Sequence, residues 1–337
     1  MPGRAKYSLH LHHPSCKATW PIPGPKYSGI ISGMSLFNHL RGVFAAVVTP
    51  LRPDYSCAAE EMPALLDFLA KRGCHGALIL GTTGEGPSFA PDERLDLMRT
   101  ALKIRQLHPN FRLLAGTGTP SLEETVLLTR GAFDLGYDGV VVLPAYYFRH
   151  APEDGLFEWF KQVLVRAVPS DGALLAYHIP PISGVPISIE LLKRLRDEFP
   201  GQFAGVKDSS GDAKHAIALG DTFGCELVVL NGNDRLFSLA LQAKASGCIT
   251  ALANLASPLL NQLWELHSRG EVTTEIQSQL DAARKVLESF PPAPPFVKSI
   301  LSQRYNFPVW TVRPPLLPMP PHQIEQASQN WVETYHG

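Results

Sequence analysis

A lysine that ends an apolar run has the clearest potential for chemistry in this sequence. Lys207 follows residues 203–206, whose composition predicts a buried strand. Burial disfavours the charged ammonium form, and a neutral amine in a dry pocket can attack a carbonyl carbon and form an imine. Because a lysine can also extend its charged end into water at the mouth of a fold, position alone leaves both interpretations open.

Other polar side chains follow neighbouring apolar runs. Tyr177 stands in the run before that of Lys207, and Thr82 and Thr83 lie in a Gly-Thr-Thr-Gly turn that begins at Gly81. A phenol can transfer protons in carbonyl chemistry, and threonine hydroxyls with backbone amides can hold a carboxylate without adding charge. Taken alone, the tyrosine could belong to the core and the threonines to a simple tight turn. The turn lacks the Gly-Lys-Ser/Thr ending of a phosphate loop.

These residues must be positioned by a regular alternation of apolar runs and helical segments. The runs have little polar alternation, as expected for parallel strands buried on both faces. They span residues 43–48, 77–80, 112–115, 139–143, 174–178, 203–207, 226–230 and 247–250. Helices are expected between them, for example over 121–135, where Ser121 and Glu124 form a capping-box pattern. The alternation predicts an α/β fold, a (β/α)8 TIM barrel, over an open doubly wound sheet.

Three regions are expected along the chain. Residues 34–255 should form the barrel, and residues 256–337 a C-terminal helical extension with helices over 258–268, 271–290, 296–304 and 322–335. Residues 1–33 contain five prolines and no acidic residue, and Met34 could serve as a start codon. We therefore expect residues 1–33 to be a disordered or non-native extension.

Composition excludes several classes of function. Thirty basic and 31 acidic residues give a net charge of −1, which argues against nucleic acid as a partner. No apolar run reaches the roughly 20 residues that a membrane span needs. The five cysteines are scattered and include no Cys-x-x-Cys pair, so neither a disulfide framework nor a metal site is expected. The sequence thus predicts a cytoplasmic protein, with Cys74 and Cys248 as small core residues.

In combination, the motifs resemble the dihydrodipicolinate synthase and N-acetylneuraminate lyase superfamily, whose members are Schiff-base aldolases. The resemblance extends from about Gly42 to about Pro318. It rests on motifs that occur in this order at strand ends: Gly81-Thr82-Thr83-Gly84-Glu85, Pro144-x-Tyr146, Tyr177-x-x-Pro180 and Gly205-Val206-Lys207-Asp208. Each motif alone is weak evidence, but their combination is specific.

The resemblance implies a set of catalytic roles. Lys207 would condense with the ketone of pyruvate or a larger 2-oxo acid, and Tyr177 would act as general acid and base. Thr82 would relay protons between Tyr177 and Tyr146, with Tyr147 as the alternative relay tyrosine. Because this tyrosine often comes from a neighbouring subunit in the superfamily, a homodimer or homotetramer is implied. The covalent imine with the lysine would serve as electron sink, so no cofactor is expected.

The resemblance also implies which residues bind substrate. Thr83, in the turn that begins at Gly81, would hold the pyruvate carboxylate, and the backbone carbonyl of Ile249 would face the bound pyruvate. Asp234 matches a position of the sialic acid lyase, although Arg235 stands where that lyase has an acid. Arg235 could instead meet a distal carboxylate of the substrate.

One departure bears on the second substrate. The synthase carries an arginine two residues after Tyr-x-x-Pro, where this chain has Ile182, which cannot bind a carboxylate. Arg149 or Arg235 could take over that contact. The sequence therefore favours a lyase that joins or separates pyruvate and an aldehyde, acting on a 4-hydroxy-2-oxo acid or a sugar-derived 2-oxo acid. A dihydrodipicolinate synthase, a 2-oxo sugar acid dehydratase and a non-catalytic barrel that binds a 2-oxo acid remain alternatives.

Overall fold

A closed barrel of eight parallel strands forms the centre of the structure, a computed structural model that describes residues 36–224 and 226–335. Each strand pairs with its neighbours in sequence order, and β1 pairs with β8 to close the sheet. The strands are β1 (Gly42–Ala46), β2 (Gly76–Ile79), β3 (Arg112–Gly116), β4 (Gly139–Val142), β5 (Leu174–His178), β6 (Phe203–Asp208), β7 (Val228–Asn231) and β8 (Gly247–Thr250). The predicted TIM barrel is confirmed.

All eight predicted strands are present, with small differences at their ends. The largest difference at a strand start is in β7, which begins at Val228 and not at residue 226. Glu226 is exposed and pairs with Arg196 on the surface, so the polar start of that run lies outside the sheet. Almost every strand residue is buried, which explains the unbroken apolar runs.

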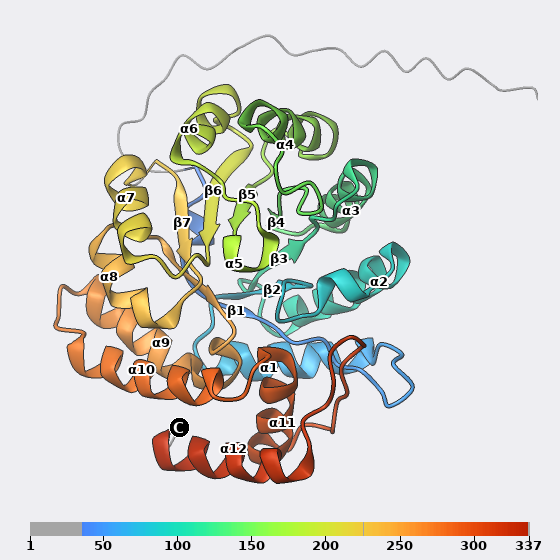
Figure 1. The fold of residues 1–337 in the computed structure, drawn as a ribbon, viewed down its shortest axis with the longest axis vertical. Coiled ribbons are helices and arrows are strands. Elements are labelled where there is room, and N and C mark those ends of the chain that lie inside the picture. Colours follow the sequence, from blue (N-terminus) through green and yellow to red (C-terminus); the bar gives the residue numbers. More distant parts are fainter. Residues whose placement is uncertain (1–35, 225, 336–337) are drawn as a thin grey trace, which may run out of the picture. The chain divides into compact units, whose positions relative to one another are not determined.

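Helices cover the outside of the barrel, as Figure 1 shows. They are α1 (Met62–Lys71), α2 (Pro91–Ala101), α3 (Leu122–Leu135), α4 (Glu153–Ala167), α6 (Ile189–Glu198), α7 (Ala213–Phe223) and α8 (Phe237–Gln242). The short helix α5 (Pro180–Ser183) follows β5 directly and lies inside this ring of helices in Figure 1. The Ser121 side chain caps α3 by accepting from the backbone N–H of Glu124, as the sequence predicts, and Ser188 caps α6 in the same way through Leu191.

The chain ends in four further helices: α9 (Ala253–Ser268), α10 (Thr274–Glu288), α11 (Ala293–Tyr305) and α12 (Pro321–Thr334). Helix α9 starts at Ala253, before the predicted start at Pro258. It bends at Ala256, where φ is −117° and ψ is 30°, so Pro258 falls in the first turn after the bend and tolerates its missing N–H. In Figure 1, α11 and α12 lie on the same side of the barrel as α1.

The core has two layers that follow from alternation along the strands. One layer fills the barrel interior and includes Phe44, Leu78, Tyr177 and Ile249. The other lies between the strands and the surrounding helices, and it contains the predicted core cysteines Cys74 and Cys248. Side chains that point into the barrel near the carboxyl ends of the strands are therefore brought together at one end of the interior.

Two expectations concern the ends and surface of the chain. The predicted extension over residues 1–33 lies outside the described residues. Among the described helices, none is long and apolar enough to cross a membrane.

Candidate active site

Lys207 lies beside Tyr177 because β5 and β6 are parallel neighbours in matched register. The register pairs Tyr177 with Lys207 directly, and both side chains belong to the barrel interior. Lys207 is only 2% exposed, and its Nζ lies 4.2 Å from the centroid of the Tyr177 ring. The lysine therefore does not extend into water, which removes the alternative that its position in the sequence left open.

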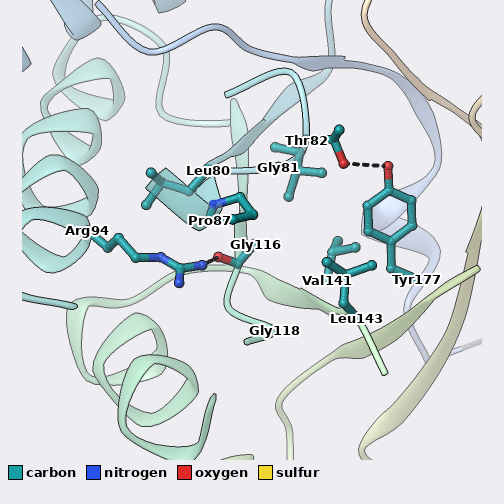
Figure 2. Close-up of a pocket in the computed structure, with 11 residues that line it drawn as sticks. Leu80, Gly81, Thr82, Pro87, Arg94, Gly116, Gly118, Val141, Leu143 and Tyr177 are labelled. Atoms are coloured by element: carbon teal, nitrogen blue, oxygen red, sulfur yellow. Dashed lines mark hydrogen bonds between the residues drawn. The ribbon is translucent and has the colours of Figure 1, made fainter. Parts of the chain in front are cut away.

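The Tyr177 hydroxyl, on β5, contacts a side chain from the turn after β2. Its oxygen is 3.3 Å from Oγ1 of Thr82, which follows β2 (Figure 2). Burial by itself raises the pKa of this phenol, but the positive charge of Lys207 and hydrogen bonds with Thr82, Lys207 and Ser209 outweigh burial and lower it. A phenol with a lowered pKa gives up its proton more readily, as a general acid and base must.

Backbone contacts hold the turn that carries Thr82 and Thr83. The N–H of Glu85 donates to the carbonyl of Thr82 at 3.1 Å, and the N–H of Gly86 donates to the carbonyl of Gly81, also at 3.1 Å. A Cβ at Gly86 would lie 2.0 Å from the Leu80 carbonyl oxygen, so only glycine fits there. Thr83 is buried and Thr82 is half-buried, and the Thr82 hydroxyl is the one that contacts Tyr177.

A small cavity of about 20 Å³ lies beside Tyr177. Gly81, Thr82 and Tyr177 line it on one side, and Arg94 lies on the other side (Figure 2). The walls between them are apolar or backbone: Leu78, Leu80, Pro87, Gly116, Gly118, Val141 and Leu143. Ile249, predicted to face pyruvate, is buried on β8 within the interior layer that contains Tyr177.

The predicted relay tyrosine has other neighbours in this single chain. Tyr146 follows β4 and is half-buried; burial raises its pKa, while the charge of Arg94 lowers it and that of Glu124 raises it. The hydrogen bond of the Thr82 hydroxyl goes to Tyr177. Tyr147 is 76% exposed. A relay through Tyr146 of a neighbouring subunit therefore stays a proposal.

Asp234 and Arg235 are held by α10 and not by the groups around the lysine. Asp234 is fully buried and accepts a hydrogen bond from Arg284 of α10 at 2.8 Å. Arg235 pairs with Glu288, also on α10, at 2.7 Å. Because these ion pairs engage both side chains, the roles in substrate binding that the sequence suggested for them are not part of the proposed function.

Two buried charged residues near the site were missed by sequence reasoning. Arg94 of α2 is 2% exposed and donates to the carbonyl of Gly116 at 2.8 Å. Lys298 of α11 is 1% exposed and pairs with Glu85 of the turn at 2.5 Å. A charged residue at an apolar position of an amphipathic helix is the signal that could have found them.

A cluster of His178, Asp208 and His215 lies close to the lysine in sequence, with ligand atoms within 4.8 Å of one another. The register pairs His178 with Asp208 directly after the pair of Tyr177 and Lys207. Nδ1 of His178 accepts the N–H of Ile187 at 2.9 Å, so its remaining proton is on Nε2 and that nitrogen has no lone pair for a metal. The His178 and His215 rings also stack, with centroids 4.6 Å apart. This cluster suits a structural role better than metal binding.

Comparisons with known proteins agree with this geometry. The sequence profile of the dihydrodipicolinate synthetase family matches residues 39–332. The chain belongs to this family. Its members are lyases, and the same assignment holds for this chain.

Individual relatives of the family cover most of the chain. An uncharacterized DapA-like lyase of Chloroflexus aurantiacus is 36% identical over 84% of this chain and 93% of its own length. A 4-hydroxy-tetrahydrodipicolinate synthase of Corynebacterium jeikeium is 32% identical over 73% of this chain and 80% of its own. The Escherichia coli prophage protein YagE, solved in complex with pyruvate, has 25% identity and a TM-score of 0.80, covering 88% of this chain and 98% of that one.

Acidification is expected to destabilise the fold through His178. Burial lowers its pKa to about 4, with Asp208 raising and His215 lowering it. The unfolded chain binds this proton near pH 6.5, so the contribution of His178 to the free energy of unfolding should be constant above pH 6.5 and fall between pH 6.5 and 4 by on the order of 3 kcal/mol. Urea unfolding across this pH range measures the loss. The variant His178→Asn should flatten the slope, and an unchanged slope would show that His178 is not its origin.

Proposed function

We propose that this protein is a Schiff-base lyase that makes or breaks the carbon–carbon bond between pyruvate and an aldehyde. The observation that carries the proposal is the Lys207 amine, 2% exposed, 4.2 Å from the centre of the Tyr177 ring. The Thr82 hydroxyl, 3.3 Å from the Tyr177 hydroxyl, supplies a partner for proton transfer at the same place. An amine, a phenol of lowered pKa and a hydroxyl are the groups that imine chemistry requires.

The reaction can be followed in the cleavage direction. The Lys207 amine attacks C2 of the 2-oxo acid, and Tyr177 delivers a proton to the carbinolamine oxygen, which leaves as water. In the resulting protonated imine, the C3–C4 bond breaks as the C4 hydroxyl loses its proton to the Tyr177 phenolate left by the preceding step. The electron pair of that bond moves into the imine, which becomes an enamine, and the aldehyde departs. Protonation of the enamine at C3 and hydrolysis by water release pyruvate and free Lys207.

The turn beside Tyr177 would bind the carboxylate of pyruvate. Thr83 is buried next to Thr82, and backbone N–H groups of a turn can hold an anion without burying a counter-charge. Ile249 lies in the interior layer that contains Tyr177, and its backbone carbonyl would face the bound 2-oxo acid. Relay of protons to solvent through Tyr146 would require a second copy of the chain, so we propose a homodimer or homotetramer as the active form.

The residues proposed to select the second substrate lie in or beside the turn after β5. Ile182 stands where the synthase has its carboxylate-binding arginine, and it is 60% exposed. Arg149 packs across the same turn: a Cβ built at Gly184 would lie 2.9 Å from its Nε. A guanidinium at this place could bind a distal carboxylate of the substrate. We therefore propose a 4-hydroxy-2-oxo acid that carries an acidic group.

Dihydrodipicolinate synthase activity is the second candidate. A relative with 32% identity is named as a 4-hydroxy-tetrahydrodipicolinate synthase. Both activities begin with the same imine of pyruvate, so they differ only in the aldehyde that follows. Ile182 counts against aspartate semialdehyde as that aldehyde, because it cannot pair with the carboxylate.

Reduction with borohydride in the presence of pyruvate should attach a pyruvate-derived mass to the peptide that contains Lys207. The reduction traps an imine as a stable amine, and peptide mass spectrometry locates it. Lys298 is an internal control, since it is equally buried but paired with Glu85. A Lys207 peptide without the added mass would exclude an imine mechanism at this lysine.

Replacing Tyr177 by phenylalanine should lower kcat by roughly 10²- to 10⁴-fold, because the general acid and base is lost while the ring remains. Steady-state kinetics measure the effect. Tyr137→Phe is the matched control: Tyr137 is also buried, and its hydroxyl donates to the Met98 carbonyl at 3.0 Å. This control should lose some stability and keep its turnover. Near-normal kcat in Tyr177→Phe would remove Tyr177 from the proposed role.

Replacing Arg149 by alanine should raise KM about tenfold or more for 4-hydroxy-2-oxo acids with a distal carboxylate, since one charge-assisted contact contributes about 1.5–3 kcal/mol. Analogues without that carboxylate should be unaffected, and they serve as the control. The measurement is the rate of pyruvate release from each 4-hydroxy-2-oxo acid, for the wild-type protein and the variant. Consumption of aspartate semialdehyde is measured in parallel, because it is the substrate of the second candidate activity. Equal effects on both substrate sets would reject Arg149 as the carboxylate-binding residue.

A further inference from the structure

An ion pair between Glu85 and Lys298 joins the Thr82–Thr83 turn to the C-terminal helices. Nζ of Lys298 lies 2.5 Å from Oε1 of Glu85, and each side chain is 1% exposed. The residues are 213 positions apart in the sequence. The contact therefore ties the loop after β2 to helix α11, which lies outside the barrel.

Glu85 is rigidly linked to the threonines that precede it. Its backbone N–H donates to the Thr82 carbonyl at 3.1 Å, and its backbone is left-handed, with φ of 56°. The carbonyl of Gly84, the residue before Glu85, accepts a hydrogen bond from the Thr49 hydroxyl at 2.7 Å. A displacement of the Glu85 carboxylate would therefore move the turn and the Thr82 hydroxyl with it.

The C-terminal segment adds further hydrogen bonds to this pair. The backbone N–H of Arg313 donates to Oε2 of Glu85 at 3.0 Å, and Lys298 also donates to the Thr311 carbonyl at 2.6 Å. The Arg313 side chain continues the contact by donating to the Ser88 carbonyl at 2.8 Å and to Glu93 at 2.5 Å. The turn is thus held by contacts with both α11 and residues 311–313.

Stability alone is a weak reason for such a pair. Two buried charges lose their hydration, and well-packed apolar residues of similar volume are often as stable or more so. A hydrogen-bonded charge pair does, however, fix direction and distance more tightly than apolar packing does. The pair is therefore better suited to holding the turn in place than to stabilising the barrel.

We propose that Lys298, acting through Glu85, is a positioning residue that sets the Thr82 and Thr83 hydroxyls against Tyr177 and the pyruvate carboxylate. The inference deepens the proposed function and rests on it, because it assumes that the turn binds pyruvate. Misplacement of a reacting group by about 1 Å can slow a reaction roughly 10²-fold. The C-terminal helices thereby take part in the geometry of a site to which they supply no catalytic side chain.

The test compares the full-length protein with the double variant Glu85→Gln/Lys298→Met, which removes both charges with little change of volume. KM for pyruvate should rise about tenfold and kcat should fall, since the loosened turn holds the carboxylate and Thr82 less well. Hydrogen exchange of a peptide covering residues 81–86 should become at least about tenfold faster. The variant Glu85→Asp keeps the charge but shortens the side chain, and it should show the same changes in a protein that folds normally.

Arg72→Met is the matched control. Arg72 at the end of α1 donates to the Leu255 carbonyl at 2.9 Å and packs over the Tyr305 ring, so it also joins the barrel to the C-terminal helices. Its hydrogen bonds go to Leu255, Tyr305 and Tyr335, away from the turn. This variant should be less stable but keep its KM, kcat and exchange at residues 81–86.

Two outcomes separate the inference from the proposed function. Wild-type KM, kcat and exchange in the Glu85 and Lys298 variants would overturn the positioning role while leaving the imine mechanism intact. Failure of the wild-type protein to trap pyruvate at Lys207 would overturn the proposed function. In that case the exchange measurement alone would still show whether Lys298 holds the turn.

Discussion

The register between β5 and β6 is the constraint on which the candidate site depends. In a parallel pair, residues opposite each other point to the same side of the sheet, so the pairing of Tyr177 with Lys207 sends both side chains into the barrel. The following pair, His178 with Asp208, points away from it and packs with α7. A shift of one residue would reverse these side chains and place an imidazole or a carboxylate in the interior. The cluster of His178, Asp208 and His215 outside the barrel thus favours the same register that places Tyr177 and Lys207 inside it.

Buried charge is distributed around the site with a partner for each group. Lys207 lies over the Tyr177 ring, Arg94 donates to a backbone carbonyl, Lys298 meets Glu85, and Arg284 meets Asp234. Three of these four cations have a carboxylate or carbonyl as partner. Lys207 has the phenol of Tyr177 as its partner, and a protonated phenol carries no full charge. Of these four cations, the one that faces a phenol is the one proposed to react.

The sequence was sufficient for the fold and for the contacts within the interior. Buried parallel strands appear as unbroken apolar runs, and strand ends meet at one edge of a barrel, so the order of the motifs alone placed Lys207, Tyr177 and Thr82 together. The Lys298–Glu85 pair could not be predicted, because its partners are 213 residues apart and no local pattern joins them. The ion pairs of Asp234 and Arg235 could not be predicted for the same reason, because their partners on α10 lie 50 and 53 residues away.

The contacts that α11 and residues 311–313 make with the loop after β2 have a consequence for synthesis on the ribosome. All strands of the barrel have been made by Thr250, but Lys298, Thr311 and Arg313 follow much later in the chain. A nascent polypeptide could close its barrel and bring Lys207 to Tyr177 before Lys298 is available to pair with Glu85 and hold the turn that carries the threonines. The barrel would then reach its full activity only after α11 and residues 311–313 had docked against the turn.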